Sequence, residues 1–268
     1  MSPLRIAVAV LVALAARPAP AFGPGEGRAI VVGQLEEILK GARIRDYAPF
    51  ETERGEGALL VLYATDAVDP PDDATLPADA DCATRVTGIP LLAHYHVALV
   101  VRGALVDTVD VPSDGLLALP LGNRGAANAR DWGQATDDPG GLQDTRLVKL
   151  ADYTGDGNAW EFRLVRPHGC GAPDTLLAGY SARQRRAILY PVVRDGDASV
   201  WNPGFFPPPD APDARRITVL AGCDGAARGR REKYVFDPAR DAWRRARVRP
   251  ARCPAAPSEP LVDERVLS

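Results

Sequence analysis

Short runs of alternating or continuous apolar residues, separated by Gly, Pro and Asp, dominate the chain. Residues 160–165 alternate: Trp160, Phe162 and Leu164 fall on one face of an extended segment, and the charged residues between them fall on the other. The apolar run at 146–150 precedes this strand. The two runs together predict a hairpin, and the polar segment between them is its connection.

Other runs predict further strands. The continuous apolar run 58–63 indicates a buried strand, whereas 94–101 and 104–111 indicate a hairpin that turns at Arg102 and Gly103. Additional strand patterns lie at 187–193, at 216–221 and in a hairpin over 233–243.

Residues 28–40 are the best helix candidate, because apolar side chains recur there near helical spacing and Gly41 can end the helix in a left-handed conformation. The sequence contains no internal repeat of fixed period, which argues against a full propeller. We therefore expect a mostly β fold of antiparallel sheets and hairpins, sandwich-like or a partial propeller, with one or two short helices.

The first 21 residues have the pattern of a secretory signal peptide. Arg5 precedes the unbroken apolar run 6–16, and small residues follow at Ala19 and Ala21. Cleavage after Ala21 is expected, with export to the periplasm or out of the cell.

Domain boundaries follow from this cleavage. We expect one β-rich domain over 22–253, either undivided or split into two subdomains near 113–144, and a flexible tail over 254–268. No second apolar run reaches the length of a membrane span, so no span is expected in the cleaved chain.

Charge gives no support for nucleic acid as a partner. The chain has a formal net charge of -3, and loss of Arg5 and Arg17 with the signal peptide would leave -5. A mildly acidic chain lacks the overall basic character of nucleic-acid-binding proteins. The expected partner is an unidentified extracellular or periplasmic ligand or protein.

Four cysteines are present, an even number that favours two disulfides in an exported chain. They are Cys82, Cys170, Cys223 and Cys253. Three connectivities are open; we favour Cys223–Cys253, which would close a C-terminal hairpin, with Cys82–Cys170 as the second bond. None of them lies in a C-x-x-C pair, which excludes zinc-ribbon and thioredoxin-like motifs.

The connection before the 160–165 strand carries oxygen-bearing side chains at alternate positions. Asp152, Thr154 and Asp156 occupy positions 1, 3 and 5 of a loop, and Asn158 at position 7 can offer its backbone carbonyl. Gly157 stands where such a loop turns sharply. Calcium takes about six to eight oxygen ligands, so this spacing indicates a calcium-binding loop.

The segment 152–162 resembles the single D-x-[DN]-G-D-G calcium loop of an FG-GAP/VCBS-type repeat and, more distantly, dockerin and EF-hand loops. The resemblance implies Ca²⁺ bound by Asp152, Thr154, Asp156 and the Asn158 carbonyl in an extracellular β scaffold. It covers only this short segment of the 268 residues.

Two departures from these patterns matter. Arg163 stands where an EF-hand needs its bidentate Glu, which excludes the EF-hand. Trp160 replaces the Asp usual in FG-GAP loops; Glu161 follows one residue later and could substitute, although a one-residue shift on a strand reverses the face. A turn without metal, whose carboxylates accept hydrogen bonds from backbone N–H groups, is the alternative.

A second chemistry is possible at the three histidines. His94 and His96 share one face of the predicted strand, and His168 could approach from elsewhere. Three His ligands around a metal with an open position would suit a metal-dependent hydrolase. The alternative is that they are ordinary sheet residues, because H-x-H alone has little specificity.

Two other segments are candidate sites. Trp201, Phe205 and Phe206 could form an aromatic ligand surface, or could simply pack their Pro-rich loop. Ser181 lies in a sequence that begins like a nucleophile elbow but lacks the second Gly, so we expect a turn serine, at the start of a short helix over 182–186. No catalysis is indicated by these motifs.

Overall fold

The computed structural model describes residues 24–68, 91–115, 117–119, 147–166, 174–206, 216–222, 228–253 and 265–267. Over these ranges the protein is mostly β, with several antiparallel sheets and one helix, which confirms the predicted fold class. No helix within the described ranges has the length and apolarity that crossing a membrane requires.

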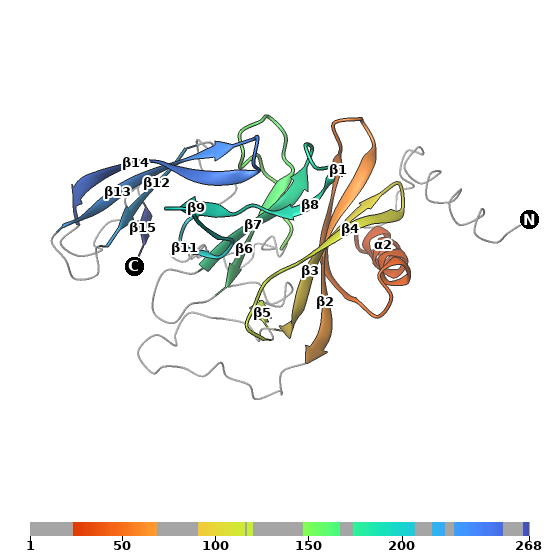
Figure 1. Cartoon of the computed structure of the whole chain (residues 1–268). Coiled ribbons are helices and arrows are strands. Elements are labelled where there is room, and N and C mark those ends of the chain that lie inside the picture. Colours follow the sequence, from red (N-terminus) through yellow and green to blue (C-terminus); the bar gives the residue numbers. More distant parts are fainter. Residues whose placement is uncertain are drawn as a thin grey trace, which may run out of the picture.

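Sheet A is the first of three sheets, with the order β1-β2-β3-β4 and β5 paired with β3. Its strands are β1 (Arg43–Glu51), β2 (Gly57–Val68), β3 (Leu91–Val101), β4 (Ala104–Asp110) and β5 (Leu117–Leu119). Helix α2 (Pro24–Ile38) lies against one face of this sheet (Figure 1). The helix begins before the predicted residue 28, and Gly41 follows its end with φ of 77°, as its glycine predicted.

The continuous apolar run of β2 follows from its position between two layers. Leu60 and Leu62 face the core between sheets A and B, whereas Val61 and Tyr63 pack with Leu35 of α2. A strand covered on both sides has no solvent face, so alternation is lost. This confirms the prediction of a buried strand over 58–63.

The hairpin predicted around Arg102 and Gly103 is confirmed. Val101 pairs with Ala104 across a two-residue turn, and the φ angles of Arg102 and Gly103 are 49° and 79°. Positive φ at both central residues is the type I′ arrangement, whose twist matches the flanking strands.

Sheets B and C complete the fold. Sheet B contains β6 (Glu161–Arg166), β7 (Asp174–Ser181), β8 (Arg186–Leu189) and β11 (Asn202–Pro203). Sheet C has the order β10-β9-β14-β13-β12-β15. Its strands are β9 (Val192–Arg194), β10 (Asp197–Ser199), β12 (Arg216–Ala221), β13 (Arg228–Asp237), β14 (Ala242–Arg252) and β15 (Arg265–Leu267).

Sheet B lies between the other two sheets (Figure 1). Phe162, Leu176 and Ala178 face a core shared with sheet A, whereas Leu177 faces a second core that contains Trp243 of sheet C. Because both faces of sheet B are covered, even a charged residue on its second face is withdrawn from water. Glu161 is the residue to which this applies.

The predicted hairpin between 146–150 and 160–165 is wrong in its first arm. Strand β6 pairs with β7, and residues 147–150 form no strand; only Ala151 makes an isolated bridge, to Glu161. Instead, the buried carboxylate of Asp46 accepts hydrogen bonds from the N–H groups of Leu147 (2.6 Å) and Val148 (2.9 Å). A side chain distant in sequence thus satisfies the backbone that a strand partner would have satisfied.

Within the predicted flexible tail, Arg265–Leu267 pair in parallel with β12. Cys253, just after β14, is disulfide-bonded. The other three cysteines lie outside the described residues, and so do residues 1–23 with the predicted signal peptide. The disulfide pairing and the cleavage both stay predictions.

Candidate functional site

The segment 152–158 is a compact turn closed by its own carboxylates. Asp152 Oδ1 accepts from the N–H of Asp156 (3.0 Å), and Asp152 Oδ2 accepts from the N–H of Gly157 (2.9 Å). Asp156 Oδ1 accepts from the N–H of Asn158 (2.8 Å). Gly155 and Gly157 have φ angles of 69° and 94°, which other residues rarely adopt, so the two glycines permit this path.

Glu161 holds the same turn from beneath. Its side chain is 1% exposed, and Oε2 accepts from the N–H of Tyr153 (2.9 Å) and, at 3.4 Å, from that of Thr154. Thr154 is also buried, and its hydroxyl donates to Glu161 Oε1 at 3.5 Å. Two of the five predicted calcium ligands therefore turn toward each other and away from the exposed part of the loop.

The contacts of the loop favour the turn without metal that the sequence left open. Asp152 and Asp156 stay together at the surface, but their oxygens already accept loop N–H groups, and the side chain of Asn158 is exposed. Within the described ranges, no three His, Cys, Asp or Glu side chains are grouped so that they could hold a metal ion. The donor set in this arrangement does not fit the many oxygens that calcium takes. Calcium binding stays a prediction from the sequence.

The carboxyl of Glu161 is electrostatically unusual. Burial raises its pKa to about 8; the backbone N–H of Tyr153 acts against this rise, and the carboxylates of Asp156 and Asp152 add to it. The hydroxyl of Tyr190 donates to the Tyr180 carbonyl (2.8 Å) and lies 3.4 Å from Glu161 Oε1. A protonated Glu161 can therefore donate to that hydroxyl oxygen and hold its proton at neutral pH.

Glu161 lies in a pocket of about 440 Å³ where sheets B and C meet. The pocket is lined by residues of both sheets and of the turns beside them. These residues are Thr154, Asp156, Glu161, Tyr180, Ser181, Ala182, Arg183, Tyr190, Arg216, Val235, Phe236, Pro238 and Asp241. A concave site with a few polar groups and a perturbed pKa is the usual form of a binding site for small molecules.

Asp241 lines the pocket and is the acceptor of a cluster of hydrogen bonds there. Its Oδ2 accepts from Ser181 Oγ (2.8 Å), from Arg183 Nη2 (2.7 Å) and from Gln184 Nε2 (2.7 Å). Asp241 belongs to the β13–β14 turn of sheet C, whereas its donors lie in sheet B, at the end of β7 (Ser181) and in the turn that follows (Arg183 and Gln184). The contact therefore joins the two sheets at the pocket.

Ser181 is a turn residue, as predicted, because its Oγ also accepts the N–H of Gln184 (3.0 Å). One related prediction, the short helix over 182–186, is wrong. Strand β7 ends at Ser181, and the residues that follow form a turn and not a helix. All of β7 is buried, so its sequence shows no alternation of apolar and polar residues. Gly179 within it is also more typical of a loop than of a strand.

The charge of the pocket is balanced at neutral pH. Asp156 and Asp241 are acidic, Arg183 and Arg216 are basic, and Glu161 is uncharged below its pKa of about 8. Apolar surface comes from the β13 residues Val235 and Phe236 and from Pro238, just beyond the strand. The pocket thus presents hydrogen-bond donors and acceptors beside an apolar wall, without excess charge.

The histidines predicted as an alternative metal site have other contacts. His96 Nδ1 lies 2.7 Å from Asp110 Oδ1, its Nε2 lies 2.9 Å from Thr65 Oγ1, and its ring stacks on Tyr63. Both of its ring nitrogens are therefore occupied. His94 is exposed on the same strand, and His168 lies outside the described residues.

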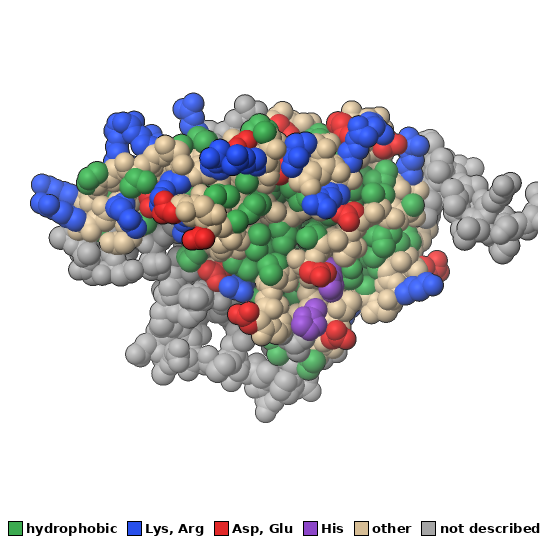
Figure 2. All heavy atoms as spheres, in the orientation of Figure 1, with side chains coloured by type: hydrophobic (Ala, Val, Ile, Leu, Met, Phe, Trp, Pro, Cys, Tyr) green, Lys and Arg blue, Asp and Glu red, His purple; other side chains and the backbone are tan. Residues whose placement is uncertain are grey.

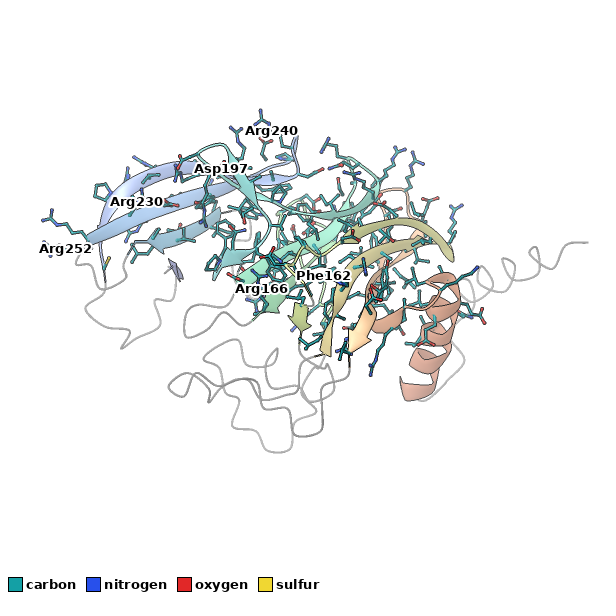
Figure 3. All side chains as sticks on the ribbon, turned by 60° about the horizontal axis from the view of Figure 1, so that its bottom comes forward. Phe162, Arg166, Asp197, Arg230, Arg240 and Arg252 are labelled. Atoms are coloured by element: carbon teal, nitrogen blue, oxygen red, sulfur yellow. The ribbon has the colours of Figure 1, made fainter. Side chains whose placement is uncertain are left out.

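The aromatic loop packs into the core, which is one of the two alternatives considered from the sequence. Phe205 and Phe206 are buried with Trp243 and Tyr234 in the core between sheets B and C. Trp201 is half-buried, donates to the carbonyl of Pro112 (2.8 Å) and lies under the guanidinium of Arg166. Figure 3 labels Phe162 near the start of β6 and Arg166 at its end.

Sequence reasoning missed most of the pocket. Tyr190, Arg216 and Asp241 carry no motif. Tyr190 is held against β7 by hydrogen bonds to the carbonyls of Leu177 and Tyr180, whereas Arg216 and Asp241 reach the pocket because sheet C stacks on sheet B. One signal for the site was present in the sequence. Glu161 lies between Trp160 and Phe162, in a predicted strand that could be buried on both faces. No protein-family model, curated protein or solved structure matches the chain. The fold and the pocket define the class, a layered antiparallel β protein with a polar pocket between two of its sheets.

Proposed function

We propose that this protein binds a small, uncharged polyhydroxyl molecule, such as a neutral sugar, in the pocket between sheets B and C. The observation that supports this most is the convergence of Glu161, Tyr190 and Asp241 from separate strands and turns onto one pocket of about 440 Å³. The expected export of the chain places the ligand in the periplasm or outside the cell.

Three properties of the pocket support the class of ligand. Its charges balance, so an ionic ligand would leave an unpaired charge in a partly buried site. Both donors and acceptors line it, which suits hydroxyl groups. Phe236 and Val235 give an apolar wall, and sugars present an apolar face of C–H groups beside their hydroxyls. The pocket volume lies in the usual range of about 300–1,000 Å³ for small-molecule sites.

Thermal unfolding in the presence of neutral mono- and disaccharides tests the proposal, with a uronic acid and an amino sugar as charged comparisons. A bound sugar at about 100 times its Kd stabilises the native state by about 2.7 kcal/mol, so the midpoint rises. We expect a rise with at least one neutral sugar and a smaller rise with its charged analogues.

A matched pair of variants assigns any rise to the pocket. Val235 is 39% exposed and lines the pocket, whereas Val248 is 42% exposed on the neighbouring strand and does not line it. Val235→Trp should fill the pocket and abolish the rise, and Val248→Trp should keep it. The proposal fails if no neutral sugar raises the midpoint, or if both variants respond alike.

A further inference from the structure

Strands β13 and β14 form a ribbon whose charge is opposite to that of the rest of the chain. Between Arg228 and Arg252 lie ten basic and three acidic residues, a formal charge of +7, whereas the whole chain carries -3. The remainder of the chain therefore carries -10. Figure 2 shows Lys and Arg side chains gathered over this ribbon, at the upper left of the molecule.

The register places several of these cations on one face. Arg231 pairs with Arg249, and Lys233 pairs with Arg247, so like charges stand directly opposite each other. Arg244 shares this face, because residues on alternate positions of the pairing point to the same side. The opposite face carries Tyr234 and Trp243, which are buried in the core. We call the set Arg231, Lys233, Arg244, Arg247 and Arg249 the basic face.

Like charges directly opposite in an antiparallel pair destabilise the sheet. The chain supplies acids for some of the ribbon's cations: Arg245 pairs with Glu232 and Asp195, and Arg244, on the basic face, pairs with Asp237 at 3.2 Å. Within the described residues, however, Lys233, Arg247 and Arg249 form no ion pair and no side-chain hydrogen bond. The repulsion among Lys233, Arg247 and Arg249 is therefore not offset by any described acidic side chain.

The face is also accessible along its edge. In the described part of sheet C, β14 pairs with β9 only at Trp243 and Arg244, and from Arg245 to Arg252 its single strand partner is β13. In Figure 3 the labelled Arg252 lies at the far end of the ribbon, and its side chain extends away from the other sheets. A long molecule can lie along this ribbon without displacing any other described strand.

We propose that the basic face binds a linear polysaccharide that carries repeated carboxylate or sulfate groups. Cations on it are spaced by about 7 Å along each strand and about 5 Å across the pair, so one flexible chain with repeated anions can contact several of them. Because the rest of the protein is acidic, this attraction is local to the ribbon. It is separate from the binding of a neutral sugar in the pocket.

The side chains of the ribbon favour a polysaccharide over other polyanions. Single-stranded nucleic acid is bound on exposed aromatic side chains, and the ribbon's Tyr234 and Trp243 are fully buried while Phe236 packs at the core edge. An anionic membrane surface is usually held by apolar anchors as well as cations. Val235 and Val248 are the ribbon's only large apolar residues exposed by more than a third.

Binding to polygalacturonate, measured by titration at low salt, tests this proposal, with neutral dextran, duplex DNA, single-stranded DNA and anionic vesicles as comparisons. The variant combines Lys233→Gln, Arg247→Gln and Arg249→Gln. Its control combines Lys40→Gln, Lys149→Gln and Arg186→Gln, which removes the same charge from exposed positions on other elements. We expect the ribbon variant to lose about tenfold or more in affinity and the control to change by about twofold or less.

Two further results bear on the proposal. At low salt the ribbon variant should unfold at a higher temperature than the wild type, and the difference should shrink in high salt, since the variant removes screened repulsion. This also shows that the variant folds. Absence of polygalacturonate binding by the wild type, equal losses in both variants, or tighter binding to DNA or vesicles would each overturn the assignment.

Discussion

Glu161 connects the turn at 152–158 to the pocket through one side chain. One carboxyl oxygen, Oε2, accepts the N–H groups of Tyr153 and Thr154, and the other, Oε1, lies near the hydroxyl of Tyr190. Burial between two sheets makes the ionised form costly, which raises the pKa of Glu161 to about 8. The residue predicted as a substitute calcium ligand is thus, in the structure, an internal brace.

The raised pKa of Glu161 predicts a pH dependence of stability. The unfolded carboxyl titrates near 4.5 and the folded one near 8, so between these values only the folded state holds the proton. Stability contributed by Glu161 is complete below pH 4.5 and is lost as pH rises to 8. Relative to Glu161→Gln, the wild type should lose about 1.4 kcal/mol per pH unit in this window, measured by urea unfolding.

Glu53 provides a comparison of opposite sign. The hydrogen bond from Tyr180 lowers the pKa of Glu53, so its contribution is present above its unfolded pKa of 4.5 and is lost as pH falls through its folded pKa. Glu53→Gln should therefore show the same pH dependence of stability between pH 5 and pH 8 as the wild type. Parallel curves for the wild type and Glu161→Gln would contradict the account of Glu161.

At the scale of elements, the pairing of β6 with β7 requires a glycine at its centre. Glu161 pairs with Gly179, and a Cβ at 179 would overlap the carbonyl oxygen of Trp160 and lie 2.8 Å from the Cα of Glu161. The missing side chain lets the two strands approach while the Glu161 side chain turns over β7. Gly179 therefore determines where the backbone of Glu161 lies beside the pocket.

Gly179→Ala is expected to destabilise the protein by about 2 kcal/mol or more, because backbone atoms would have to move. Gly33→Ala is the matched control: it lies within α2, where nothing approaches the added Cβ within 4 Å. There alanine should stabilise by up to about 1 kcal/mol through helix propensity. Chemical denaturation measures both, and similar effects at the two positions would exclude a close approach at Gly179.

At the scale of the whole molecule, the contact of Asp241 with the β7–β8 turn joins sheet C to sheet B. Asp241 is only 7% exposed, and its carboxylate accepts hydrogen bonds from the side chains of Ser181, Arg183 and Gln184. Asp241 itself has φ of 50°, a conformation that Gly and Asn tolerate well. The contributions of the Asp241 backbone conformation and of its side chain to the free energy of unfolding can therefore be separated by the choice of substitution.

Asp241→Gly keeps the backbone conformation and removes the acceptor, so it should cost about 1–3 kcal/mol in urea unfolding. Asp241→Asn keeps an oxygen acceptor and should cost less. The matched control is Asp195→Gly, with φ of 52° but a side chain that is 74% exposed; its effect should be small. Equal losses for Asp241→Gly and Asp195→Gly would show that the junction of the sheets contributes nothing.

Much of the fold could be predicted from local patterns. The I′ turn at Arg102–Gly103, the buried run 58–63 and the left-handed Gly41 all depend on neighbours in sequence, and all three are found. Strand β1 and strand β7 could not be found in this way. The first has charged and proline residues in its sequence, and the second is buried on both faces, so neither shows the alternation of a half-buried strand.

The candidate site was predictable in part. The sequence determined that 152–158 is a tight turn, because Gly155 and Gly157 permit positive φ and the short Asp side chains can accept nearby N–H groups. It also determined the charge reversal between the ribbon and the rest of the chain. Both properties belong to residues close together in the chain.

Only the tertiary structure decided the orientation of the Glu161 side chain and the residues that contact it. A single strand has two faces and its sequence does not say whether the second is covered; here the stacking of sheet C on sheet B covers it. That burial withdraws the carboxyl from water and raises its pKa to about 8, and the same stacking brings Asp241 to the pocket. Desolvation and long-range contact depend on which layers stack, and no local pattern encodes that choice.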